Sequence, residues 1–519
     1  MDASGLFTVL GIFIAIITLI SEERRQDFFL RASWIDTLCF FIFNLIALTV
    51  IYSSVVIEVF NIEGINYIWG FDDKTVVLTC VILMSLIFVL KLRSKRLPIS
   101  NYGEWDDFSY KLLKDKKYNI LNFLFEKYLD QFLFEIDKQG LYENFHKFIR
   151  VNSQLRYEEI LNISSIKISK FRKFKFFIFS RVLLYIPKEI SGKTNLINSI
   201  SRLIKSSGFL NYLVDVHSTI PIKLTSLNCF LRIEEFVDGF FKLLISNENS
   251  LLYRELRDNQ GFLYSKGFDI LPENFLLNYY FSNTDVAIKV MLWQPIGDYL
   301  CEFIRSQNGK NNYYNSYCNN FYSTDERWSC KIYVGIYFFN FMVSSSIYQK
   351  KDDHMSLNYY NNFLDEILNN IDRSENSETW QENPLKFDYL INIMVNYCCD
   401  WVLASNTLLT DQNDKIVAID FASNCLGEML RKILLSKKVD EKQKINYLNK
   451  VLKTMILLDV KNEKLSLNIF NSLVGVTLFS KADSDITWLK RIYLESDFDL
   501  RSKDSVFNVE FYKILKKAL

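Results

Sequence analysis

The sequence predicts a mainly α-helical protein that is attached to a membrane at its N-terminus. Glycine (16 residues) and proline (6 residues) are scarce in this chain of 519 residues, and a shortage of helix breakers favours long helices. Hydrophobic residues make up 49% of the chain, which is enough for a sizeable core. Long uncharged apolar runs are concentrated near the N-terminus. We therefore expect three transmembrane helices within residues 1–97, followed by a large, mostly helical cytoplasmic region.

The expected spans cover residues 5–20, 35–60 and 75–90. The first, GLFTVLGIFIAIITLI, and the third, TVVLTCVILMSLIFVL, contain no charged residue, and the second has acidic residues only near its ends. These lengths are close to the ~20 residues with which a helix crosses a bilayer. A run that is apolar on all faces suits lipid or a deep core. The alternative is therefore a buried helical hairpin in a soluble domain.

The distribution of charge predicts how these spans are oriented. The loop between spans two and three contains Glu63, Asp72 and Asp73 against a single Lys74, whereas the other two flanking segments are basic. Basic flanks stay on the cytoplasmic side, so we expect the N-terminus outside and the C-terminal region in the cytoplasm, at the cell inner membrane. No ionisable residue lies in the middle of a span, which argues against a pump or a proton relay. The basic residues are Arg24, Arg25, Arg31, Lys91, Arg93, Lys95 and Arg96.

The cytoplasmic part is expected to comprise three regions. Residues 98–165 form a helical juxtamembrane region, 166–310 a core with a short β-meander, and 311–519 a helical C-terminal region. Apolar residues recur at helical spacing in 110–136, where Leu112, Ile120, Leu124 and Tyr128 share one face. The same spacing recurs in residues 362–371 and 444–458.

The stretch PKEISGKTNLINSI, residues 187–200, contains the ending of a phosphate-binding loop. Gly192, Lys193 and Thr194 precede a helical run, and the residues before them are rich in Phe, Ile and Val, as in strands. In such loops, backbone N–H groups at a helix N-terminus hold phosphate, the lysine reaches its oxygens and the threonine holds magnesium. The alternative interpretation is a chance tripeptide at the start of a helix.

Two segments together resemble ABC-type ATPase heads of the chromosome-maintenance, recombination-repair and overcoming-lysogenization-defect kind. Residues 166–200 are similar to the β-meander, the loop and the start of the following helix in those heads. Residues 415–434 are similar to their strand ending in a magnesium aspartate, with Asp420 at that position and Asn424 at the family's asparagine. The resemblance implies an α/β head that binds ATP and magnesium. Pro187 stands where that loop has its first glycine, and Phe421 replaces the catalytic glutamate. Because proline lacks an N–H and phenylalanine cannot polarise water, the resemblance implies a degenerate head without catalysis.

A basic and aromatic run, KISKFRKFKFF at residues 167–177, predicts contact with an anionic surface. A membrane surface is favoured over nucleic acid, because the chain is expected to be anchored there and its net charge is only +1. The alternative is a solvated charged face. The residues of this expected surface are Lys167, Lys170, Arg172, Lys173 and Lys175.

The sequence contains no motif of established catalytic or metal-binding specificity. Its nine cysteines include no CxxC pair and its three histidines are far apart, so we expect no metal site, no catalytic residue and no cofactor, ATP with magnesium being the alternative. The leading hypothesis is a non-enzymatic membrane-anchored sensor or effector at the bacterial inner membrane, acting in anti-phage defence by membrane disruption. This hypothesis is an architectural analogy. The alternatives are a membrane-bound pseudo-ATPase and a scaffold that recruits a soluble enzyme. The expected partners are the lipid bilayer, further copies of the chain and a cytoplasmic protein.

Overall fold

The structure is a computed structural model, and its described residues are almost entirely helical. They comprise 3–60, 71–137, 191–226, 233–260, 269–309, 312–318, 325–351, 355–373, 384–408, 417–459, 463–475, 488–489 and 491. Within these ranges the structure has no strand, and Tyr317 and Leu385 form an isolated β-bridge. The prediction of a mainly α-helical protein is therefore confirmed. The predicted β-meander lies outside the described residues.

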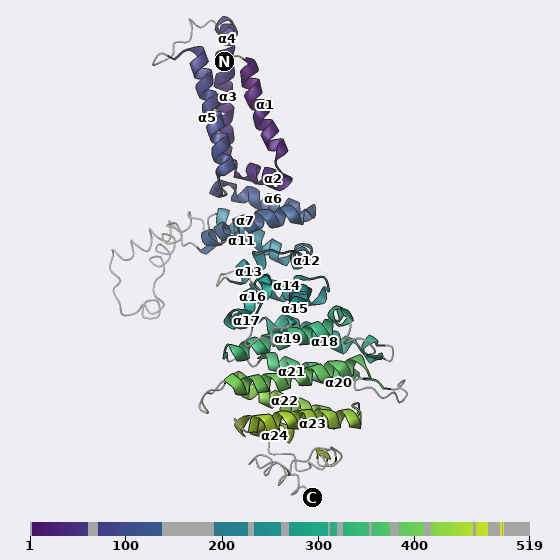
Figure 1. Cartoon of the computed structure of the whole chain (residues 1–519). Coiled ribbons are helices and arrows are strands. Elements are labelled where there is room, and N and C mark those ends of the chain that lie inside the picture. The colour runs from purple at the N-terminus through teal and green to yellow at the C-terminus, as the bar shows by residue number, and fades with distance from the viewer. Residues whose placement is uncertain are drawn as a thin grey trace, which may run out of the picture. The chain divides into compact units, whose positions relative to one another are not determined.

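The chain divides into two compact units, each described on its own below. An N-terminal unit comprises Met1–Phe209 and Ser218–Arg232, and a C-terminal unit comprises Leu210–His217 and Ile233–Leu519. Figure 1 shows the helices of the N-terminal unit in purple to teal. They are α1 (Ala3–Leu19), α2 (Glu22–Arg31), α3 (Trp34–Ile51), α4 (Ser53–Phe60), α5 (Asp73–Arg93), η2 (Ile99–Asn101), α6 (Tyr102–Lys114), α7 (Tyr118–Asp137), α11 (Ser191–Lys205) and α13 (Ile220–Thr225).

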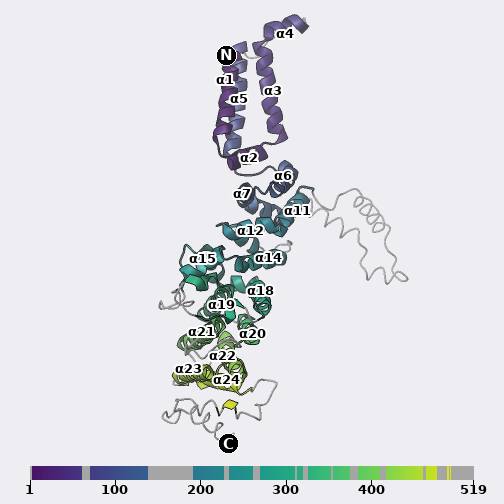
Figure 2. The same cartoon turned by 90° about the vertical axis from the view of Figure 1, so that its right-hand side faces the viewer.

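The C-terminal unit is a stack of helices. Helices α18 to α24 contact both the next helix along the chain and the one after it, as in α18 with α20, α19 with α21 and α22 with α24. Figure 2 shows the successive layers that result. Stacked helix pairs of this kind bury a continuous core along the stack. The helices are α14 (Ile233–Ser246), α15 (Leu251–Asp258), α16 (Phe275–Phe281), α17 (Thr284–Lys289), α18 (Trp293–Ser306), η3 (Tyr313–Asn315), η4 (Asp325–Ser329), α19 (Lys331–Tyr348), α20 (Met355–Asn370), α21 (Lys386–Leu408), α22 (Val417–Leu435), α23 (Glu441–Asp459) and α24 (Glu463–Leu473). Helix α12 (Ser207–Asp215) contains the boundary between the units.

The most deeply buried helix of the C-terminal unit is α19. All residues from Ile332 to Ile347 are buried, including Asn340 and three consecutive serines that end at Ser346. A helix that is buried on every face has neighbours all around it, and here they are α14, α15, α17, α18, η4, α20, α21 and α22. Polar side chains in such a position need partners inside the protein.

The N-terminal helices differ from the prediction in number. Two helices of the described residues, α3 and α5, are long and apolar enough to cross a membrane, whereas α1 has 17 residues and falls short of that length. The count of three is therefore not supported. The second expected span, 35–60, is interrupted at Tyr52, which lies between the end of α3 at Ile51 and the start of α4 at Ser53.

Candidate membrane anchor and the buried charges at its base

Helices α1, α3 and α5 pack against one another along an apolar seam. A single buried cluster joins Leu6 of α1, Ala47 and Val50 of α3, and Val77 and Met84 of α5. These side chains are at most 6% exposed, so the three helices form a bundle with its own small core.

The outward face of this bundle is apolar and uncovered in the structure. Only 11% of the apolar stretch of α3 and 28% of that of α5 are buried. A core helix of a soluble protein would be covered on most sides, and exposed apolar patches of this extent mark an interaction surface. The outward side chains, each 40–64% exposed, include Phe7, Ile14, Phe41, Leu45, Ile82 and Leu86.

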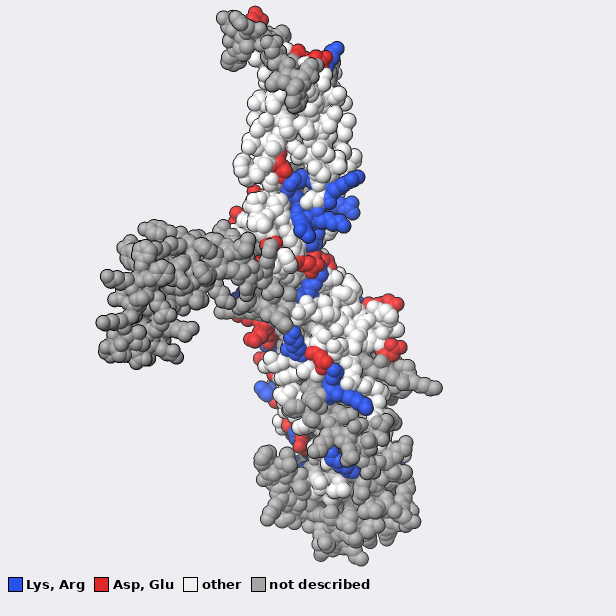
Figure 3. All heavy atoms as spheres, turned by 90° about the vertical axis from the view of Figure 1, so that its left-hand side faces the viewer, with Lys and Arg blue, Asp and Glu red and all other residues white. Residues whose placement is uncertain are grey.

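Charged side chains border this apolar face at each end. Figure 3 shows a cluster of Lys and Arg directly beyond the white apolar zone. At that end Lys91 pairs with Asp36 at 2.6 Å, and Asp36 also forms a capping box with Ser33 that begins α3. At the other end Asp72 caps α5 by accepting a hydrogen bond from the Thr75 backbone at 2.8 Å. The exposed basic residues at the first end are Arg24, Arg93, Lys95 and Arg96.

A group of buried charges lies at the basic end, on the short helix α2. Asp27 is 2% exposed and Arg31 is 4% exposed, and their side chains form an ion pair at 2.7 Å. Lys127 of α7 approaches the same Asp27 carboxylate at 2.6 Å, and the Tyr128 hydroxyl donates a hydrogen bond to its other oxygen. Burial, followed by this contact with Asp27, raises the pKa of Tyr128 well above its usual range. Asp27 thus joins α2 to α7 through two partners, Lys127 and Tyr128.

Arg31 also joins α2 to the end of α5. Its guanidinium donates to the carbonyl oxygens of Lys91 at 2.7 Å and of Ser94. These carbonyls belong to the last turn of a helix and its C-cap, which have no partners within the helix and carry a partial negative charge. A cation is stabilised there. The side chain of Asn101 adds hydrogen bonds to the carbonyls of Leu30 and Ala32 at 2.8 and 3.1 Å.

The sequence indicates only part of this buried charged group. Asp27 and Arg31 are spaced four apart, so they share one helix face. From the sequence, Arg31 is recognisable only as part of the basic loop between the first two expected spans. Asp27 carries no such signal, because its partner Lys127 on α7 is 100 residues further on.

Gly192, Lys193 and Thr194 are helical and belong to the first described turn of α11. A Cβ on Gly192 would meet the ring of Tyr102 at 3.4 Å and the carbonyl oxygen of Ile99 at 3.9 Å. Further along, Trp105 of α6 donates to Ser199 at 3.1 Å. In the structure this segment therefore packs against η2 and α6.

Asp420, the expected magnesium ligand, lies in the first turn of α22. Residues 417–420 are thus helical, where the resemblance implies the end of a strand. The Asp420 carboxylate pairs with Lys464 of α24 at 2.7 Å and accepts from Asn468 at 3.3 Å. One turn later Asn424 accepts from Ser472 of α24 at 3.2 Å. These contacts join two helices of the C-terminal unit.

The expected anionic-surface residues Lys167, Lys170, Arg172, Lys173 and Lys175 lie outside the described residues, as does His354. His217 is described and packs on Phe275, with ring centroids 4.5 Å apart. Among the described residues no group of three or more His, Cys, Asp or Glu side chains could hold a metal ion. Comparison with protein-family models, with characterised proteins and with solved structures finds no match to this chain.

Proposed function

We propose that the protein is a membrane-anchored, non-enzymatic sensor or effector of the bacterial inner membrane, with its helical body in the cytoplasm. The observation that supports this proposal is the apolar outer face of the α1, α3 and α5 bundle with charged residues at both ends. Apolar side chains in water are unfavourable by roughly 25 cal/mol per Å². Lipid removes that cost without a protein partner.

We propose further that α1 crosses the membrane together with α3 and α5. Helix α1 is only one residue shorter than α3, with 17 against 18 residues. Leu6 shares the buried cluster with Val77 near the start of α5, and Phe13 stacks on Phe88 near its end with 4.6 Å between ring centroids. The two helices therefore run in the same direction along each other. Three crossings then place the N-terminus outside and the basic end in the cytoplasm, consistent with the positive-inside rule.

The buried charges at the base suit a protein whose cytoplasmic helices and membrane helices act together. Arg31 contacts the end of α5, while its partner Asp27 contacts α7. A displacement of α7 would therefore act on α2 through Asp27, and on α5 through the hydrogen bonds of Arg31 to the carbonyls at the end of that helix. On this proposal the output is a change in the bilayer, such as the membrane disruption of anti-phage effectors.

Membrane insertion is tested with the full-length chain expressed in bacteria. The wild-type protein should stay in the membrane pellet after washing with alkaline carbonate. The double variant Ile82→Arg/Leu86→Arg should leave the pellet or be degraded, because each arginine in the centre of a span costs about 2.5–3.5 kcal/mol. Both side chains are exposed, at 56% and 51%, so the substitutions remove no buried contact.

The matched control is Leu271→Arg/Leu457→Arg, which changes two exposed leucines of the C-terminal unit, 47% and 61% exposed. This variant should remain in the washed membrane pellet. Extraction of the wild-type protein by carbonate would refute the anchor. Effector activity is measured separately as loss of membrane potential after induction, which the wild type should cause and the Ile82→Arg/Leu86→Arg variant should not. A wild type in the membrane without this effect would leave the anchor standing and refute the effector.

A further inference from the structure

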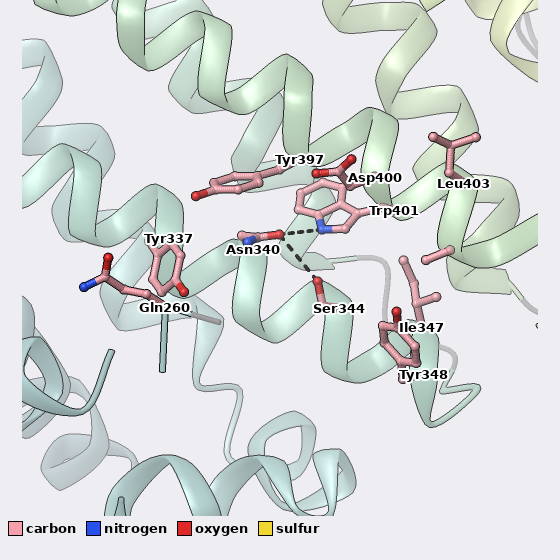
Figure 4. Close-up of a pocket in the computed structure, with 11 residues that line it drawn as sticks. Gln260, Tyr337, Asn340, Ser344, Ile347, Tyr348, Tyr397, Asp400, Trp401 and Leu403 are labelled. Atoms are coloured by element: carbon pink, nitrogen blue, oxygen red, sulfur yellow. Dashed lines mark hydrogen bonds between the residues drawn. The ribbon is translucent and has the colours of Figure 1, made fainter. Parts of the chain in front are cut away.

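The C-terminal unit contains a cavity of about 280 Å³ between α19 and α21. Figure 4 shows the side chains around it. Asn340 and Ser344 belong to the buried helix α19, and Trp401 and Asp400 belong to α21. This volume is slightly below the ~300–1,000 Å³ that is typical of small-molecule sites. It therefore suits a small ligand.

The orientation of the Asn340 amide is fixed by its neighbour. The indole Nε1–H of Trp401 donates to Oδ1 of Asn340 at 2.8 Å, and Ser344 donates to the same oxygen at 3.4 Å. An indole N–H is a donor only, so the amide must present its oxygen to Trp401. The amide nitrogen is thereby turned to the opposite side, toward Tyr337 and Tyr397, as Figure 4 shows.

This amide nitrogen is buried and has no hydrogen-bond partner. Asn340 is 0% exposed, and no acceptor meets its Nδ2 atom. Buried donors in folded proteins are nearly always paired, and an exception calls for a water, an ion or a ligand. A donor that lines a cavity is placed to receive an acceptor from whatever fills the cavity. The occupant must therefore present a carbonyl or similar oxygen to Asn340.

The other walls define the rest of the occupant. The rings of Tyr337, Tyr348, Tyr397 and Trp401 line the cavity, and aromatic faces favour a flat ligand that stacks on them. Among the residues that the structure describes, no lysine or arginine lines this cavity, and Asp400 is the one charged lining residue. An anion such as a phosphate would lack a counter-charge there, so the occupant is neutral or cationic.

Asp400 of α21 also lines the cavity. Its side chain retains exposed surface, yet burial by the surrounding helices raises its pKa, partly offset by Lys450. A carboxylate in this position accepts N–H hydrogen bonds. The lining residues therefore include a donor, the Asn340 amide, and an acceptor, the Asp400 carboxylate.

We propose that this cavity binds a small neutral heteroaromatic lactam of the nucleobase class. Such a ring is flat, carries a carbonyl oxygen for Asn340 Nδ2 and has N–H groups for Asp400. A nucleotide is disfavoured because the phosphate would have no basic partner among the described lining residues. This proposal goes beyond the membrane function and does not depend on it.

The first test compares two bicyclic ligands on the full-length protein in detergent. Hypoxanthine has the carbonyl acceptor and N–H donors, whereas indole has a similar size and an N–H donor but no carbonyl. Equilibrium dialysis should show hypoxanthine bound at least about tenfold more tightly than indole, as expected for one buried hydrogen bond. Equal binding of both would overturn the proposal, since the amide would then play no part. Binding of neither would show that water alone occupies the cavity.

Two matched pairs of variants locate the site. Ser344→Val fills part of the cavity and should weaken hypoxanthine binding at least about tenfold, whereas Ser346→Val, on the same buried helix but not among the lining residues, should not. Asp400→Asn should weaken binding, whereas Asp269→Asn, an exposed residue of the same unit, should not. Melting temperatures show that each variant is folded. Unchanged binding in both Ser344→Val and Asp400→Asn would overturn the proposed location.

Discussion

Asp27 and Arg31 form a 2.7 Å ion pair one turn apart on α2, and their side chains are only 3% and 5% exposed. Taking two charges out of water is costly, so a buried pair is stable only when further polar contacts complete it. Lys127 and Tyr128 supply these contacts to the Asp27 carboxylate. The backbone carbonyls of Lys91 and Ser94 supply them to the Arg31 guanidinium. Removal of one member would leave the others buried without their counter-charge.

We therefore expect Asp27→Asn to loosen the base of the bundle. Breaking a buried pair by removing one partner typically costs about 3–5 kcal/mol. Hydrogen exchange of the full-length protein should show faster exchange of the backbone amides in α2 and α7, and the melting temperature should fall. The control is Glu22→Gln on the same helix, where Glu22 pairs with Lys117 at 2.8 Å and both side chains are nearly half exposed. This control should exchange like the wild type, because exposed pairs contribute little. Equal exchange in Asp27→Asn and Glu22→Gln would contradict the prediction.

Gly427 permits the close approach of α22 and α24. A Cβ at this position would lie 2.3 Å from the backbone oxygen of Ile469 and 2.7 Å from Cβ of Ser472. Backbone atoms cannot move aside as a flexible side chain can, so Gly427→Ala should separate the two helices. We expect a loss of about 1–3 kcal/mol, as for other overpacked cores, seen as a lower melting temperature of the C-terminal unit.

The matched control for Gly427 is Gly103→Ala on α6. A Cβ there would meet Asn195 at 3.4 Å, which is an ordinary contact. Because alanine favours helix over glycine by about 1 kcal/mol, this variant should be as stable as the wild type or more so. If Gly427→Ala has the same melting temperature as the wild type, α22 and α24 are not in close contact at this position.

The buried carboxyl group of Glu255 should make the free energy of unfolding depend on pH. Its side chain is 2% exposed and accepts hydrogen bonds from the backbone N–H groups of Leu276 at 3.0 Å and Leu277 at 2.8 Å. Burial raises the pKa of Glu255 from 4.5 to about 7, although these two hydrogen bonds act in the opposite direction. Between these pH values the folded state keeps a proton that the unfolded state has lost. The free energy of unfolding should therefore fall as pH rises from about 4.5 to about 7, by at most about 3 kcal/mol.

The test compares melting temperatures at pH 5 and pH 8. Glu255→Gln carries no titrating group, so its melting temperature should change less between the two pH values than that of the wild type. Glu248→Gln, at an exposed position of the same unit, should retain the wild-type dependence. An identical dependence in all three proteins would show that Glu255 does not cause it.

Local sequence patterns predicted the helices well but not where they end. Leu112, Ile120, Leu124 and Tyr128 are all buried, as the helical spacing predicted. The predicted continuous stretch is nevertheless two helices, α6 and α7, separated at Lys116, whose φ of 55° is in the left-handed region. No proline or glycine marks this turn, so the sequence carries no strong signal for it.

The site residues were harder to predict, because their roles depend on contacts between distant segments. Asn340 lies in the run FFNFM, which is typical of a core helix, and the acceptor side of its amide is set by Trp401, 61 residues later. A single polar residue in such a run is a usable signal, although it does not reveal a cavity. For Asp420, by contrast, the sequence suggested a role that its observed contacts do not reflect. It matches a family motif by position, while its carboxylate contacts Lys464 and Asn468 in a helix contact that the motif does not describe.

The last prediction concerns nucleotide binding at the GKT segment, Gly192–Thr194. A phosphate at the start of a helix needs free space in front of the first backbone N–H groups. The Tyr102 ring lies against Gly192 in this turn and is itself 2% exposed. We therefore expect the full-length protein to retain no radiolabelled ATP with magnesium in filter binding, and Lys193→Ala to behave like the wild type. ATP that is retained by the wild type and lost on Lys193→Ala would contradict this expectation and favour the pseudo-ATPase. Lys205→Ala, at the other end of the same helix, is the control for a general effect of lost charge.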